Sequence, residues 1–246
     1  MAAPAISWRV SLAPVSVQTG VAILVPARGG SKRLPGKNIR RLGGASLLEW
    51  TWRAVQAAEI PVVPFLSTDD EAIADEGRRL GFRVPGLRPR QLAEDDTPTP
   101  DVVLHWLDTT PEFGQSEPEL IMLLQATSPF RHPDLLRDGL ANMRANKEAQ
   151  ALVAVKPVDV GLAHIYTASA GYLSRLSSES GAAFVPSGAL YMIRPAALRE
   201  SKTFTPSRCL YLQHNGLTTL DIDTEDDWII AEAALGAGRI SLPEMK

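Results

Sequence analysis

The sequence has a single cysteine, Cys209, in 246 residues, so neither an intramolecular disulfide nor a cysteine-based metal cage can form. It also lacks a long apolar run, since none approaches the ~20 residues that a membrane-spanning helix needs. Excess positive charge is missing too: 25 lysines and arginines against 28 aspartates and glutamates give a net charge of −3. That balance argues against general nucleic-acid binding. These absences predict a soluble, cytoplasmic protein without nucleic-acid or membrane partners.

Short apolar runs alternate with helical patterns along most of the chain, which favours β-α-β units. Such units build a mostly parallel sheet with helices on both faces, so we expect an α/β fold of the Rossmann-like, three-layer α/β/α kind. Strands are expected at 21–27, 61–70, within 119–130, and at 151–158, 188–195 and 217–223. Helices are expected at 45–59, 70–81, 101–110, 133–146 and 224–238.

The pattern predicts one domain at 21–246, preceded by an N-terminal extension at 1–20. Within the domain, the segment 158–186 is small, polar and rich in glycine and serine, and it interrupts the alternation. We expect this segment to form a flap or a dimerisation excursion.

Several helix ends carry capping residues. Thr224, with Asp227 three residues later, predicts the start of the last helix. Asp69 and Asp70 are expected to cap the helix at 70–81, and Gly81 is expected to end it.

Four polar clusters follow expected strands: "PARGGSKRLPGKN" after Val25, "STDD" after Leu66, "QATSP" after Leu124, and "DID" from Asp221. Because ligands bind beyond the carboxyl ends of parallel strands, these clusters predict one site. Asp221 and Asp223 are alternate residues of an expected strand, so both would point to the same face. Two adjacent carboxylates repel unless a cation lies between them, and such hard oxygen ligands suit Mg²⁺. The alternative is that one of them caps the following helix.

The stretch "VPARGGSKRLPGKNIRRLGG" at 25–44 concentrates positive charge in a slightly acidic chain; its cations are Arg28, Lys32, Arg33, Lys37, Arg40 and Arg41. It is not a Walker A loop, because five residues separate Gly30 from Gly36 and Asn38 stands where Ser or Thr would hold magnesium. A P-loop NTPase is therefore disfavoured. Glycines and cations after a buried strand favour a phosphate site, and a solvated basic turn is the alternative.

The stretch "VPARGGSKRLPGKNI" closely resembles the signature loop of the acylneuraminate cytidylyltransferase (CMP-sialic acid synthetase) family. "LSTDDEAIADEGRRLG", "LRPRQLAEDDTPT", "LLQATSPFR", "GALYMI" and "LDIDTEDD" match in the same order, so the resemblance spans about 21–235. It implies a nucleotide-diphospho-sugar transferase-like fold. It also implies an Mg²⁺-requiring enzyme that transfers CMP from CTP to the anomeric hydroxyl of a 3-deoxy-2-keto sugar acid, releasing pyrophosphate.

The resemblance also implies roles for individual residues. Residues expected to bind the nucleotide are Ala27, Arg28, Gly29, Ser31, Lys37, Asn38, Arg88, Gln125 and Thr127. Residues expected to be catalytic are Arg28, Lys37 and Asp223, and the expected Mg²⁺ ligands are Asp221 and Asp223. Residues expected to contact the acceptor are Gln125, Ser187 and Tyr191. Fixed cations suit this reaction because departing pyrophosphate concentrates negative charge on the β- and γ-phosphates.

The acceptor side departs from the family pattern, in which an Arg-Arg-Gln type segment precedes "NGAIY". Here "LSRLSSESGAAFVPSGALYMI" has Arg175 alone and Ser187 in place of Asn. A sugar acid remains the favoured acceptor; a small phosphonate acceptor and a non-catalytic CTP-binding module are the alternatives. Because the family commonly dimerises through an excursion, a homodimer formed through 158–186 is expected.

Overall fold

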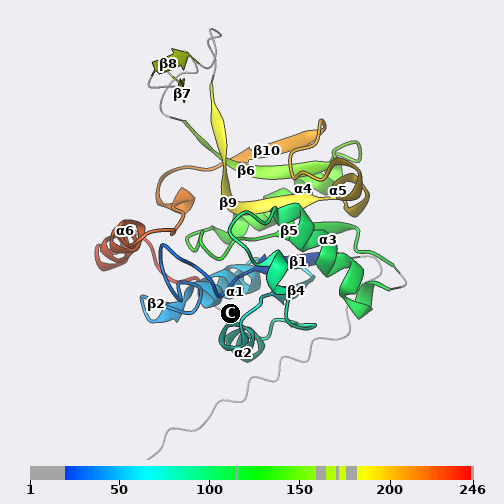
Figure 1. The fold of residues 1–246 in the computed structure, drawn as a ribbon, viewed down its shortest axis with the longest axis horizontal. Helices are drawn as coiled ribbons and strands as arrows, with labels where there is room; N and C mark the ends of the chain where they lie inside the picture. The colour runs from blue at the N-terminus through cyan, green and yellow to red at the C-terminus, as the bar shows by residue number, and fades with distance from the viewer. Residues whose placement is uncertain (1–19, 115, 159–164, 170–171, 176–181, 245–246) are drawn as a thin grey trace, which may run out of the picture.

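The protein is described by a computed structural model covering residues 20–114, 116–158, 165–169, 172–175 and 182–244, so most of the expected extension at 1–20 lies outside it. Its centre is a six-stranded sheet in the order β10-β6-β9-β5-β1-β4 (Figure 1). The strands are β1 (Val21–Pro26), β4 (Val62–Ser67), β5 (Leu120–Leu123), β6 (Ala151–Pro157), β9 (Phe184–Ile193) and β10 (Cys209–Gln213). β9 is antiparallel to both of its neighbours, and the other pairings are parallel. The expectation of a mostly parallel sheet is confirmed.

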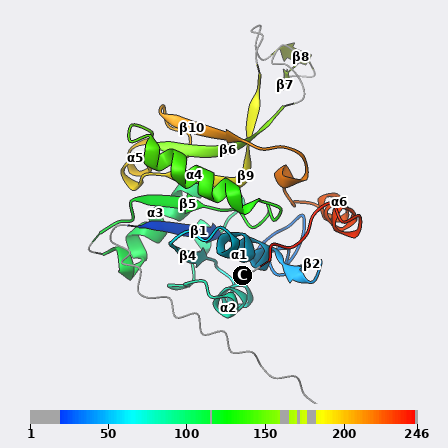
Figure 2. The same ribbon diagram turned by 180° about the vertical axis from the view of Figure 1, so that it is seen from behind.

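Side chains of β1 alternate between two cores, one on each face of the sheet. Ile23 and Val25 point into the first core, and Ala22 and Leu24 into the second. The helices that bury residues in the first core are α1 (Leu47–Ala57), α2 (Glu71–Leu80), α4 (Pro133–Ala145) and α6 (Glu225–Gly236). The second core takes residues from α3 (Thr99–Thr109) and α5 (Pro195–Ser201). Figure 1 shows α3 in front of the sheet, and Figure 2 shows α1 and α4 on the opposite side. The three-layer α/β/α fold is therefore confirmed.

The capping predictions are confirmed with one exception. Asp70 accepts a backbone N–H in the first turn of α2, and Gly81 ends that helix at φ 102°. Thr224 and Asp227 form a reciprocal capping box at the start of α6. Asp69 does not cap α2, because its carboxylate instead accepts a backbone N–H from the loop after β1.

The strand expected at 217–223 is wrong. Gly216–Thr219 forms a 3₁₀ turn, and residues 220–223 lie outside any strand. The hydroxyls of Thr218 and Thr219 donate to backbone carbonyls three residues earlier, at 2.8 Å each. Such local bonds compete with ladder bonds, so β-branched residues here stabilise a turn.

Some small elements were not predicted. The edge strand β10 alternates between half-buried and exposed positions, and so lacks the apolar run that marks the inner strands. The short helix α5 and the hairpin of β2 (Arg41–Leu42) and β3 (Ala45–Ser46) were missed as well.

The described part of the segment 158–186 contains a second antiparallel hairpin, made of β7 (Tyr166–Ser169) and β8 (Tyr172–Arg175). It stands away from the main sheet, beyond β6 and β9 (Figure 1). Residues 159–164, 170–171 and 176–181 of the expected excursion lie outside the described residues. No helix in the described part of the chain is long and apolar enough to cross a membrane.

Candidate active site

The carboxyl ends of β1, β4 and β5 lie at one edge of the sheet because these strands are parallel and adjacent. The loops that follow them carry three of the polar clusters. The fourth cluster is fastened to the same edge, since Ile222 donates its backbone N–H to the carbonyl of Thr127 at 2.7 Å. The four clusters therefore converge as predicted, although the last of them is not on a strand.

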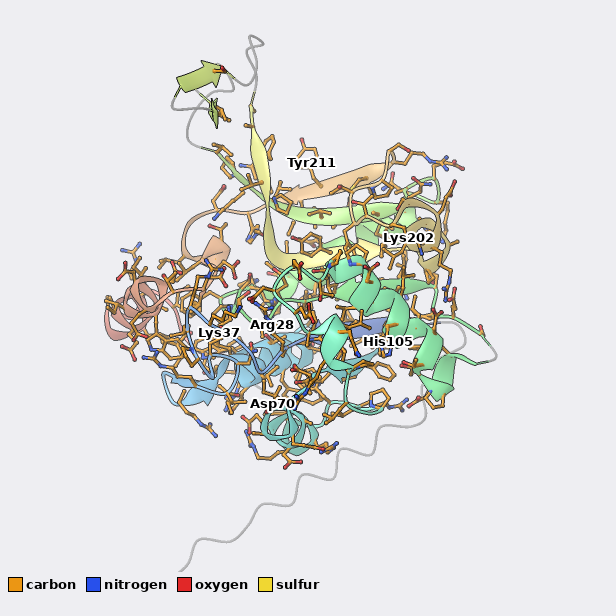
Figure 3. All side chains as sticks on the ribbon, in the orientation of Figure 1. Arg28, Lys37, Asp70, His105, Lys202 and Tyr211 are labelled. Atoms are coloured by element: carbon orange, nitrogen blue, oxygen red, sulfur yellow. The ribbon has the colours of Figure 1, made fainter. Side chains whose placement is uncertain are left out.

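A cavity of about 360 Å³ opens at this edge, and we call it the loop cavity. It is lined by Arg28, Ser31, Lys32, Arg33, Lys37, Asn38, Asp95 and Asp223. Arg28 and Lys37, both labelled in Figure 3, are among its lining residues. Five of the predicted site residues thus share one cavity.

The cations of the loop cavity are neutralised by two carboxylates of the protein. Asp95 lies 2.5 Å from both Arg28 and Lys32. Asp223 lies 2.6 Å from Lys37 and 2.5 Å from Arg33. The hydrogen bond from Lys32, joined by Arg28, lowers the pKa of Asp95. Burial tends to raise the pKa of Asp223, but Lys37 and Arg33 outweigh burial and lower it. Asp95 was not predicted; its signal was its position in "LRPRQLAEDDTPT", the second matching motif after the loop.

The backbone of the loop is held by one buried amide. Asn38 is 5% exposed and donates its side-chain N–H to the carbonyl of Arg28 at 3.0 Å. Gly36 adopts φ 67°, a left-handed conformation that favours glycine, and this bends the chain back between the two cationic segments. Asn38 therefore contributes to the shape of the cavity through this hydrogen bond, which engages its amide N–H within the protein.

Asp221 and Asp223 differ in environment. One carboxylate oxygen of Asp221 is buried with no hydrogen-bond partner among the described residues. Burial raises the pKa of Asp221, the side chain of Thr127 lowers it, and repulsion from Asp223 raises it again. A buried carboxylate oxygen without a donor, beside a second carboxylate, fits a hard divalent cation that also binds phosphate. Among the described residues, no group of three or more His, Cys, Asp or Glu side chains could hold a metal ion.

Gln125 is positioned by its contacts with β9. Its backbone N–H donates to the carbonyl of Gly188 at 3.2 Å, and its side chain packs against the Cα of Gly188. Arg131, fully buried, donates to the backbone carbonyls of Gln125 and Ala189 and to the hydroxyl of Thr51. Burial lowers the pKa of Arg131 to about 9. These bonds fix the end of β5 against β9.

The other predicted residues lie around this centre. Arg88 is 6% exposed and outside the loop cavity; its guanidinium lies 4.0 Å from Asp69, and burial lowers its pKa. Tyr191 is half-buried on β9, packs 5.5 Å from the ring of Phe204, and has a pKa raised by burial and by Asp221. Ser187 is 4% exposed, so its hydroxyl faces the interior.

Sequence reasoning assigned no role to His214, which follows β10. Its Nε2 lies 2.6 Å from the hydroxyl of Ser187, and its Nδ1 lies 3.2 Å from the hydroxyl of Thr218. The spacing of the four histidines in the sequence gives no sign of a metal site. The signal for His214 is its contact with Ser187, which the sequence does not show.

Comparisons with known proteins extend over most of the chain. The profile of a family described as "Cytidylyltransferase" matches residues 22–217. The CMP-N,N'-diacetyllegionaminic acid synthase of Legionella pneumophila is 31% identical over 221 residues, covering 85% of this chain and 93% of that protein. The pseudaminic acid cytidylyltransferase of Campylobacter jejuni is 26% identical over 216 residues, covering 83% and 91%. Among solved structures, a CMP:2-keto-3-deoxy-manno-octonic acid synthetase complexed with CTP has a similar fold, with a TM-score of 0.64, 18% identity, and coverage of 89% and 99%.

Proposed function

This chain belongs to the cytidylyltransferase family, and we propose that it transfers CMP from CTP to a 3-deoxy-2-keto sugar acid of the nonulosonate class, releasing pyrophosphate. The observation that carries the proposal is the loop cavity, in which four cations and Asp223 meet at the carboxyl edge of a parallel sheet. The similarity to the Legionella enzyme over 93% of its length supports a sugar acid as the acceptor.

In the proposed reaction, the anomeric hydroxyl oxygen of the acceptor attacks the α-phosphorus of CTP. The bond from that phosphorus to the bridging oxygen breaks, pyrophosphate leaves, and the hydroxyl proton passes to solvent. Arg28 and Lys37 stabilise the charge that develops on the departing phosphates. The side chain of Lys37 is only 12% exposed, so its charge acts in a region partly shielded from water.

We propose that Asp221 and Asp223 hold a magnesium ion, which when bound neutralises phosphate charge and orients the reacting oxygens. The unpaired, buried oxygen of Asp221 supports this role. Asp223 would exchange its present contacts with Lys37 and Arg33 for the metal, which frees both cations for phosphate.

We also propose a homodimer. Phe184, Val185 and Tyr211 are large apolar residues that are 38%, 39% and 64% exposed at the base of the β7–β8 excursion. The rings of Phe184 and Tyr211 lie 5.6 Å apart, which makes one continuous apolar patch. Light scattering should give twice the chain mass of 26.6 kDa for the wild type and a smaller mass for Tyr211→Asp. A wild-type monomer at micromolar concentration would contradict the proposal.

The function is tested by incubating the purified protein with CTP, Mg²⁺ and a panel of acceptors, then measuring pyrophosphate and the mass of the CMP product. The panel contains legionaminic-, pseudaminic- and sialic-acid-type sugars and a small phosphonate, with ATP, GTP and UTP as alternative donors. We expect pyrophosphate release with CTP and at least one sugar acid. Pyrophosphate release with the phosphonate alone would show that the acceptor is a phosphonate rather than a sugar acid. CTP binding without pyrophosphate release would show that the protein is a non-catalytic CTP-binding module.

A further inference from the structure

The carboxyl edge of the sheet has a second half, formed by β6, β9 and β10. His214 lies there, directly after β10, and donates its backbone N–H to the carbonyl of Val155 on β6 at 3.0 Å. Ser187 lies on β9, and Val155 pairs with the preceding residue of that strand. His214 thus links the end of β10 to both neighbouring strands, since its backbone N–H bonds β6 and its imidazole bonds Ser187 on β9.

The hydrogen bonds around His214 define its tautomer. The hydroxyl of Thr218 donates its single proton to the carbonyl of Asn215 at 2.8 Å, so toward His214 it can only accept. Nδ1 therefore carries the proton and donates it to Thr218 at 3.2 Å. The unprotonated Nε2 then accepts the hydroxyl proton of Ser187 at 2.6 Å. The competing acceptor for that proton, the carbonyl of Ala154, lies farther away, at 3.3 Å.

Ser187 connects His214 to the residues that face the substrates. Its backbone carbonyl accepts a hydrogen bond from the hydroxyl of Ser128 at 2.9 Å. The next residue, Gly188, accepts the backbone N–H of Gln125 and packs against its side chain. A change in the orientation of Ser187 is therefore transmitted to the strand that supports Gln125.

The surroundings keep the imidazole neutral. His214 is half-buried, and the charged groups that face it are Arg131, from the loop after β5, and Lys156, from β6. Burial lowers the pKa of His214, and both cations lower it further. A neutral imidazole is the form that accepts the Ser187 proton.

We propose that His214 is a positioning residue for acceptor binding: its neutral, Nδ1-protonated ring holds Ser187, and through it the start of β9, in the geometry that the sugar acid requires beside Gln125. This inference rests on the proposed function. Protonation of His214 turns Nε2 into a donor, so the Ser187 hydroxyl must donate to the carbonyl of Ala154 instead. Lower pH should therefore weaken acceptor binding and leave CTP binding unchanged.

The test compares His214→Leu, which removes both ring hydrogen bonds, with His214→Gln, whose amide oxygen can accept from Ser187. At pH 8 we expect the acceptor KM of the Leu variant to rise by about five- to tenfold, with the CTP KM unchanged and the Gln variant near wild type. Because burial lowers the pKa of His214 below its ordinary value of 6.5, the acceptor KM of the wild type should stay constant from pH 8 to pH 6.5 and rise as the pH falls further, whereas that of the Gln variant should stay constant throughout. Equal rises in both KM values, or the same pH profile in the Gln variant, would overturn the proposal.

A second readout does not depend on activity. In protein labelled with ¹⁵N-histidine, the His214→Gln spectrum identifies the His214 signals, and their nitrogen shifts report the tautomer. We expect the neutral Nδ1–H form at pH 7, and a neutral Nε2–H form would refute the argument even in an active enzyme. If the Leu variant does not fold, Ser187→Ala should give the same selective rise in the acceptor KM. Absence of sugar-acid transfer in the wild type would instead count against the proposed function.

Discussion

Gly188 offers a sharp test of how β9 supports Gln125, which is expected to bind the nucleotide. We expect its amide to bind the cytosine edge of CTP, because an amide offers both a donor and an acceptor. Gly188 adopts φ 74°, and a Cβ at this position would lie 2.3 Å from Oε1 of Gln125 and 2.8 Å from the hydroxyl oxygen of Ser128. The Gly188→Ala variant can relieve the first contact only by turning the Gln125 carboxamide away. We therefore expect the variant to fold and to bind CTP poorly.

A matched control separates the cost of the backbone conformation from the loss of the Gln125 contacts. A left-handed backbone costs about 1–2 kcal/mol for a residue with a Cβ. Gly238 adopts φ 65°, and a Cβ added there would have no heavy atom within 4 Å, so Gly238→Ala carries that backbone cost alone. Both variants should lose about 2–8 °C in Tm. Only Gly188→Ala should also lose the hydrogen bonds of Gln125 to the base, which corresponds to a tenfold to hundredfold drop in kcat/KM for CTP, from about 1–3 kcal/mol.

The assay is steady-state pyrophosphate release with CTP and with UTP, alongside thermal unfolding of each variant. We expect Gly238→Ala to retain wild-type turnover, and Gly188→Ala to lose both rate and preference for CTP over UTP. Wild-type kcat/KM in Gly188→Ala would refute the role of Gln125. An equal loss in Gly238→Ala would show that backbone strain alone explains the result.

Three further perturbations test the charges of the site. Asp95→Asn should tighten CTP binding by about two- to fivefold by calorimetry, since exposed ion pairs are weak, whereas the neighbouring control Asp96→Asn should not. Asp221→Asn should abolish turnover yet raise Tm by about 1–3 °C at pH 7. Burial raises the pKa of Asp221 in the folded protein, so the stability of the wild type falls as pH rises through that pKa and the carboxyl becomes charged. The gain in Tm from Asp221→Asn should therefore disappear near pH 4, below which Asp221 is protonated in both the folded and the unfolded protein. Arg131→Met should lower the free energy of unfolding by about 2–5 kcal/mol in urea titrations, because it removes the hydrogen bonds that the guanidinium donates to the carbonyls of Ala189 and Gln125 and to the hydroxyl of Thr51; an unchanged midpoint would contradict that reasoning.

The parts of the fold that could be predicted are those in which burial dictates residue type. β1 and β5 are buried on both faces, so their sequences are continuous apolar runs that no other element would explain. The helix starts were predictable because capping is local, as in Thr224 with Asp227. β10 was not, since an edge strand needs a partner on one side only and carries no such run.

The site divides in the same way. The half proposed to bind the nucleotide follows β1, β4 and β5. Arg28, Lys37 and Asn38 lie close together in sequence in one of these loops, so they could be grouped without a structure. The other half of the site depends on pairs such as Ser187 with His214, which are 27 residues apart and meet because β9 and β10 lie on either side of β6. No spacing rule links such a pair.

The internal pairing of the loop cavity explains why its cations do not act as a permanently charged surface. Asp95 and Asp223 together contact four cations, so an arriving triphosphate exchanges partners rather than meeting bare charge. The two carboxylates differ in how easily they can leave their cations. The exposed side chain of Asp95 can rotate toward solvent, whereas Asp223 is held beside Asp221 at the end of the sheet. Release of Lys37 would leave Asp223 paired with Arg33 alone beside the carboxylate of Asp221, so a metal ion bound there would favour that release. One carboxylate would in this way link the proposed nucleotide binding to the proposed metal.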